Sequence, residues 1–147
     1  MIAVDTNLLV YAHRKATPEH KSAQRALEQA AANEAGWGFS LGNVLEFWSV
    51  VTHPEAKGRP STPSEARKFL RNLVDQGGAS LWVSAQGLET RVLDTATRMG
   101  VVGPRVFDLQ IAMTALDNGA TEMWTHDAGF VRLPGLPVHD PLERQLG

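Results

Sequence analysis

Short apolar runs alternate with longer helix-like segments along this chain, and that alternation restricts its fold more than any other feature. The runs lie at residues 2–4, 36–40, 81–83 and 122–124, with a further one near Val138. Each run is too short for a helix and suits a buried strand. Strands joined by helices form a parallel sheet covered by helical layers. The sequence therefore predicts a three-layer α/β/α fold around a mainly parallel sheet of four to five short strands. We expect one domain over residues 1–147.

Capping residues mark the expected helices. Thr17-Pro18-Glu19 and Thr62-Pro63-Ser64-Glu65 both place proline after an N-cap residue, and the second is a full capping box. Ser40 and Ser84 are positioned to cap the helices that follow them. The expected helices cover residues 7–14, 17–33, 41–52, 63–75, 86–99 and 106–116.

Composition excludes several classes of protein. The absence of cysteine rules out disulfides and thiolate metal sites. We find no apolar run long enough for a membrane span and no signal peptide at the N-terminus, so we expect a cytoplasmic protein with no membrane partner. The net charge is −2, but residues 47–107 carry +3 and the remainder −5. This pattern fits a polyanionic substrate near an acidic cluster, and it also fits ordinary solvated helix faces.

Four acidic residues occupy comparable points of the strand–helix pattern. Asp5 and Asp127 each follow a predicted strand, and Asp108 begins the face of a helix that continues through apolar positions. Glu46 interrupts a helix that is apolar nearly all round and that we expect to be buried on more than one side. A carboxylate that starts an inward face requires a cation or a strong hydrogen-bond donor beside it, which we expect near Asp108.

The chemistry of such a cluster follows from its oxygen ligands. Carboxylates without cysteine suit hard cations such as Mg²⁺ or Mn²⁺, and metal-bound carboxylate sites hydrolyse phosphodiesters. A purely structural interpretation exists for each residue. Aspartate is common in caps and turns, and the strip that contains Glu46 can be a solvent face. Asp5, Thr6 or Asn7 can cap the first helix, and a cap by Thr6 or Asn7 would leave Asp5 free.

The chain resembles PIN-domain ribonucleases, and among them the VapC-type toxins of bacterial toxin–antitoxin pairs. The resemblance covers nearly the whole sequence. It is carried by Val4-Asp5-Thr6-Asn7 with Leu9-Val10-Tyr11-Ala12, Ser40 with Glu46, Phe107-Asp108-Leu109-Gln110-Ile111-Ala112, Gly119-Ala120 leading to Thr125-His126-Asp127 and Phe130, and the tail segments Leu133-Pro134-Gly135-Leu136 and Asp140-Pro141-Leu142.

The resemblance implies a catalytic acidic site of Asp5, Glu46, Asp108 and Asp127. Asp5 and Asp108 would hold a first Mg²⁺ or Mn²⁺ ion, with the other two acids binding directly or through water. Supporting roles fall to Thr6, Asn7, Ser40 and Thr125. It also implies an RNA substrate, tRNA being one structured candidate, a cognate VapB-like antitoxin that inhibits by occupying the cleft, and a homodimer. The family often has another aspartate where this chain has Gly129, so a first ion is better supported than a second.

Two other functions remain open at this point. A PIN-like module without catalytic activity could bind RNA or a protein, and Gly129 favours that alternative. A phosphatase could use Asp5 as its nucleophile, although Asn7 stands where haloacid-dehalogenase-type phosphatases have a second acid. His126 is a candidate phosphate contact and more commonly such a residue is a surface group. Tryptophans 37, 48, 82 and 124 are expected in the core or an interface.

Overall fold

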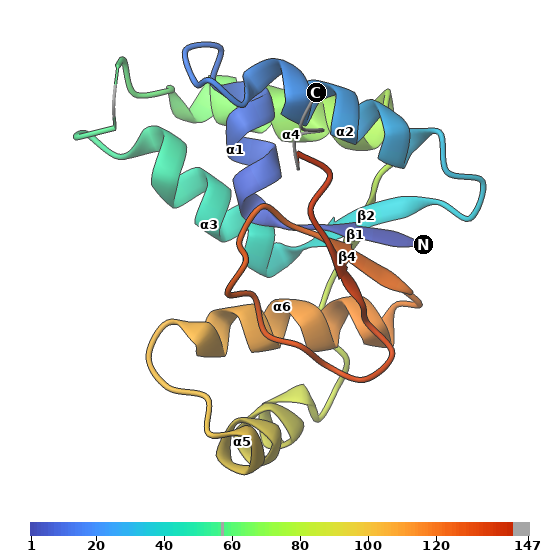
Figure 1. Cartoon of the computed structure of the whole chain (residues 1–147). Coiled ribbons are helices and arrows are strands. Elements are labelled where there is room, and N and C mark those ends of the chain that lie inside the picture. Colours follow the sequence, from blue (N-terminus) through green and yellow to red (C-terminus); the bar gives the residue numbers. More distant parts are fainter. Residues whose placement is uncertain (57, 143–147) are drawn as a thin grey trace, which may run out of the picture.

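In the computed structural model, which describes residues 1–56 and 58–142, strands and helices alternate along the chain (Figure 1). The strands are β1 (Ile2–Val4), β2 (Trp37–Ser40), β3 (Ser80–Trp82), β4 (Glu122–Trp124) and β5 (Val138–His139). The helices are α1 (Thr6–His13), α2 (His20–Ala31), α3 (Leu41–Thr52), α4 (Pro63–Asp75), α5 (Leu88–Met99) and α6 (Arg105–Asp117).

The five strands form one parallel sheet in the order β3-β2-β1-β4-β5. The chain starts in the central strand β1, proceeds outward through β2 and β3, and returns to place β4 on the other side of β1. The order therefore reverses between β1 and β4, and in open α/β sheets a reversal of this kind opens a crevice at the carboxyl ends of the strands. The predicted mainly parallel sheet is confirmed.

Helices cover both faces of the sheet, as predicted (Figure 1). On one face α1, α2, α3 and α4 bury a large apolar core, in which Phe47 of α3 stacks on Phe69 of α4 with 5.4 Å between ring centroids. On the other face α6 packs on the sheet and α5 packs on α6. No helix in the described residues combines the length and apolarity needed to cross a membrane.

Several helix and strand boundaries differ from the prediction, among them those of α2, α5 and β3. Helix α2 begins at His20 instead of Thr17, because residues 17–20 form a turn closed by the His20 N–H on the Thr17 carbonyl, and the Thr17 hydroxyl donates to the Arg14 carbonyl. Helix α5 begins at Leu88 instead of Gln86. Its N-cap is Gly87, with a φ of 86° and no side-chain hydrogen bond, so Ser84 does not cap this helix. Strand β3 lies one residue earlier than expected, at Ser80–Trp82.

Helix α3 has the predicted bounds but is only partly covered by its own chain. Phe47 and Val51 are fully buried, whereas Leu41, Leu45 and Val50 are about half exposed, at 47%, 61% and 49%. Three tryptophans, Trp37, Trp82 and Trp124, are buried as predicted, and Trp48 packs on the core from α3. Within the described residues, α3 therefore keeps an exposed apolar face.

Candidate active site

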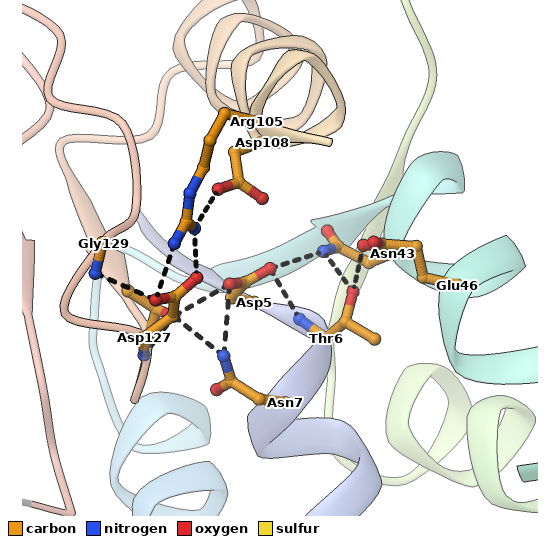
Figure 2. Close-up of polar contacts among 10 residues, drawn as sticks. Asp5, Thr6, Asn7, Asn43, Glu46, Arg105, Asp108, Asp127 and Gly129 are labelled. Atoms are coloured by element: carbon orange, nitrogen blue, oxygen red, sulfur yellow. Dashed lines mark hydrogen bonds and ion pairs between the residues drawn. The ribbon is translucent and has the colours of Figure 1, made fainter. Parts of the chain in front are cut away.

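A cleft of about 300 Å³ opens at the carboxyl ends of β1 and β4. The four predicted acids line it, and each comes from a different segment: Asp5 follows β1, Glu46 lies on α3, Asp108 lies on α6 and Asp127 follows β4. Figure 2 shows their side chains directed toward a common region around Asp5. The structure thus brings together residues that are up to 122 positions apart in sequence.

Asp5 is the most buried of these acids, with 5% of its surface exposed. Its Oδ1 accepts hydrogen bonds from the Thr6 N–H (2.8 Å) and Asn43 Nδ2 (3.3 Å), and its Oδ2 accepts from Thr125 Oγ1 (2.8 Å) and Asn7 Nδ2 (3.3 Å). Burial outweighs these donors and raises the pKa of Asp5 from 3.8 to about 6. Asp5 is also the N-cap of α1, so the alternative in which Thr6 or Asn7 caps this helix and leaves Asp5 free is wrong.

A chain of hydrogen bonds links Asp5 to Glu46. Ser40 caps α3, and its backbone N–H and hydroxyl both donate to Asn43 Oδ1. This orients the Asn43 amide, which donates to Thr6 Oγ1 at 3.1 Å as well as to Asp5. The Thr6 hydroxyl then donates to Glu46 Oε1 at 2.7 Å. Glu46 is therefore held at the cleft and does not lie on a free solvent face.

Arg105 links the other two acids, and its guanidinium lies between them (Figure 2). It donates to Asp108 Oδ2 at 2.8 Å and forms a short ion pair with Asp127. The hydrogen bond from Arg105 lowers the pKa of Asp127. The pKa of Asp108 is raised despite the same partner, because its side chain is less exposed than that of Asp127, 16% against 37%, and burial dominates.

Comparison with known protein families identifies the family of this chain. The model of the PIN domain family matches residues 2–136. The chain belongs to the PIN domain family. Among curated proteins it is 29% identical to ribonuclease VapC43 of Mycobacterium tuberculosis over 99% of this chain and 98% of that protein. It is also 28% identical to ribonuclease VapC48 of the same species, over 93% and 94%.

Solved PIN-like structures share the fold. VapC20 of Mycobacterium tuberculosis, described as a sarcin–ricin loop cleaving toxin, superposes with a TM-score of 0.67 at 15% identity, covering 88% of this chain and 92% of that one. VapBC2 of Rickettsia felis, bound to a promoter DNA fragment, gives 0.63 at 22% identity, covering 95% and 98%. These comparisons confirm the resemblance to VapC-type PIN domains that the sequence predicted.

The supporting residues of this PIN domain also converge. Thr125 Oγ1 accepts from Asn7 Nδ2 at 3.0 Å and from the Asp127 N–H at 3.1 Å, so it connects the ends of β1 and β4. The His126 N–H donates to Asn7 Oδ1, while the His126 ring lies 2.8 Å from Asp140 Oδ2. His126 therefore supports the turn through its backbone, and its ring is engaged with Asp140 beside the cleft.

The chemical type of the donor atoms in the cleft suits a divalent metal ion. PIN-domain VapC nucleases generally use one, and the oxygen-only ligands here match Mg²⁺ or Mn²⁺. Asp5 and Asp108 are desolvated and repel each other, which a bound cation would relieve. In the described residues, however, no three acidic or histidine side chains stand together as a ready ligand cluster. Glu46 is bonded to Thr6, and Asp127 is paired with Arg105.

Sequence reasoning missed two residues of this site. Arg105 lies one residue before the expected helix 106–116, but α6 begins at Arg105, three residues before Asp108, where side chains of one helix meet. It supplies the cation that the prediction required beside Asp108. Asn43 stands three residues after Ser40, at the position where a capping box has Glu or Gln. Its amide oxygen closes the box and its amide nitrogen reaches the acids.

Proposed function

We propose that this protein is a metal-dependent endoribonuclease that acts as the toxin of a toxin–antitoxin pair. The observation that carries the proposal is the convergence of four carboxylates from four segments on one cleft of a PIN domain. The curated relatives are named ribonucleases, which supports RNA as the polymer that is cut. Structured RNA such as tRNA is the substrate class we propose.

The side chains suggest a division of roles. Asp5 and Asp108 are the carboxylates with the greatest need for a counter-ion, so they would hold Mg²⁺ or Mn²⁺. When bound, the ion supplies Lewis-acid stabilisation of charge on the phosphodiester. Glu46 keeps one carboxylate oxygen free of the Thr6 hydroxyl and can accept a proton from an attacking water. Thr6, Asn7, Ser40 and Thr125 hold the acids in place.

Cleavage of structured RNAs tests this proposal. The purified protein is incubated with a tRNA pool and Mg²⁺ or Mn²⁺, beside Asp5→Asn and the matched control Asp94→Asn, an exposed position on α5. We expect cleavage by the wild type and the control, loss of at least about 100-fold in Asp5→Asn, and loss with EDTA. Equal cleavage by Asp5→Asn and wild type would rule out the catalytic assignment.

The partners are proposed on separate grounds. The neighbour VapBC2 of Rickettsia felis was solved bound to a DNA fragment from its promoter, and its name pairs a VapC with a VapB, which supports a VapB-like antitoxin for this chain. The exposed residues Leu41, Leu45 and Val50 give α3 an apolar face that a homodimer would bury. Co-expression with the protein encoded by the adjacent reading frame should give a complex without RNase activity. Light scattering of the toxin alone should give twice the chain mass.

A PIN-like binding module without catalysis is the second candidate. It is favoured by Arg105, which neutralises two of the four carboxylates. Titration with Mn²⁺ in the presence of RNA separates the two functions, because a site that binds no metal under these conditions cannot support the nuclease proposal. The match to the PIN family argues against the phosphatase alternative. Trapping of an aspartyl-phosphate on Asp5 would be needed to make a phosphatase the better explanation.

A further inference from the structure

Arg105 is held beside the cleft by contacts with two residues that line it, Asp108 and Asp127. Its Nη1 donates to Asp108 and to Asp127, and its Nη2 donates to Asp127 Oδ1 at 3.4 Å. These contacts use three of the five N–H groups of a guanidinium at most, so others stay available. The side chain is 44% exposed. Arg105 therefore presents unused donors and a positive charge to whatever enters the cleft.

The space for this guanidinium depends on Gly129. A Cβ at position 129 would lie 2.3 Å from Arg105 Nη2 and 3.0 Å from Cζ, too close for real contacts. The backbone does not explain the glycine, because Gly129 is not among the residues with positive φ. The missing side chain instead leaves room for the arginine, and the Gly129 N–H donates to Asp127 Oδ1 at 2.9 Å.

The charges of the cleft divide into two halves. Arg105 pairs with Asp127 and with one oxygen of Asp108, whereas Asp5 and Glu46 have no cationic partner among the described residues. A divalent ion between Asp108 and Asp127 would have to displace the guanidinium that already satisfies them. An ion beside Asp5 meets no such competitor.

We propose that Arg105 is the second cation of this cleft: it occupies the place of a second metal ion, limits the chain to one divalent ion, and contacts the RNA phosphate. The phosphate contact rests on the proposed function, and the metal count does not. A planar guanidinium with free donors binds phosphate oxygens and neutralises their charge, which a second metal ion would otherwise do.

Counting bound Mn²⁺ tests the proposal without RNA. Free Mn²⁺ is followed by electron paramagnetic resonance during titration of wild type, Arg105→Gln, Gly129→Ala and the control Arg25→Gln, whose arginine is exposed on α2. We expect one ion per chain in wild type and control. We expect a second ion in Arg105→Gln, which removes the charge, and in Gly129→Ala, which pushes the guanidinium aside. Wild-type stoichiometry in both cleft variants would overturn the proposal.

RNA binding in EDTA tests the phosphate contact. By fluorescence anisotropy, Arg105→Gln should bind RNA about tenfold more weakly than wild type, the change expected for one lost charged contact, and Arg25→Gln should match wild type. Equal affinity of Arg105→Gln and wild type would overturn the contact. Counting of Mn²⁺ needs no RNA, so it is independent of the nuclease function. If wild type cuts no RNA but Arg105→Gln binds a second ion, only the nuclease function is refuted. If wild type cuts RNA but Arg105→Gln binds the same number of ions as wild type, only the role of Arg105 is refuted.

Discussion

The buried carboxylate of Asp5 should make the metal-free protein lose stability relative to its Asp5→Asn variant as the pH rises from acidic to neutral. Folding raises the pKa of this group from 3.8 to about 6. Between these values the folded chain binds more protons than the unfolded chain, so the free energy of unfolding falls as pH rises from about 4 to about 6. A shift of this size corresponds to about 3 kcal/mol at full ionisation, and asparagine at position 5 carries no such penalty.

The measurement is the difference in unfolding free energy between Asp5→Asn and wild type, from urea titrations in EDTA at pH 3.5 and pH 7.5. Asparagine also disturbs the hydrogen bonds from Thr125 and Asn7, but that cost is nearly independent of pH and cancels between the two conditions. The difference should therefore move by up to about 3 kcal/mol in favour of the variant. His13, whose pKa is lowered by burial, is present in both proteins and cancels too.

One result would refute this reasoning. If the difference stays constant within about 0.5 kcal/mol, the four donors around Asp5 fully offset its burial, and the carboxylate is stable as an anion without metal. Excess Mn²⁺ at pH 7.5 provides a second check, because a ligand of the folded state alone stabilises it. Wild type should gain stability from the ion and Asp5→Asn should not.

Three further substitutions test the support of the cleft by urea denaturation. Asn43→Ala removes the amide that holds Asp5 and Thr6 and should cost about 1–3 kcal/mol; a loss well below this would mean that water replaces the amide. Gly38→Ala places a Cβ 2.5 Å from the Ser80 carbonyl and should cost about 1–3 kcal/mol, with an unchanged value showing that β2 and β3 can separate. Phe47→Ala empties a fully buried position on α3 next to Glu46 in sequence and should cost about 3–5 kcal/mol; a smaller cost would indicate collapse of the core around it.

Much of the fold followed from local signals that the tertiary structure did not override. Ser40 and Thr62 begin the helices they were expected to begin, because each has a partner three residues later that completes a capping box. Thr17 carries a similar signal, yet its hydroxyl donates to the Arg14 carbonyl and the His20 N–H donates to the Thr17 carbonyl, so a turn forms and α2 begins later. Local capping patterns cannot distinguish these outcomes, since both satisfy the same groups.

The site was predictable as a set of acids but not as a network. Parallel strands end at the same edge of a sheet, so Asp5 and Asp127 could be placed together from sequence. The requirement for a donor beside Asp108 also followed from its inward face, but the identity of that donor depended on where α6 begins. Asn43 reaches Asp5 across 38 positions, a contact that depends on how α3 packs against α1. The catalytic roles of the acids and their metal remain predictions.

The return of the chain to β4 has a consequence for synthesis. Asp5 is synthesised 120 positions before its partner Thr125, and the two meet only when β4 inserts beside β1. A ribosome-bound chain that lacks β4 has half of the hydrogen-bond donors to Asp5 Oδ2 and none of the Asp127 side of the cleft. A chain released before β4 is therefore incapable of forming the cleft, and the timing of any activity is set by the synthesis of β4 and of the segment that follows it.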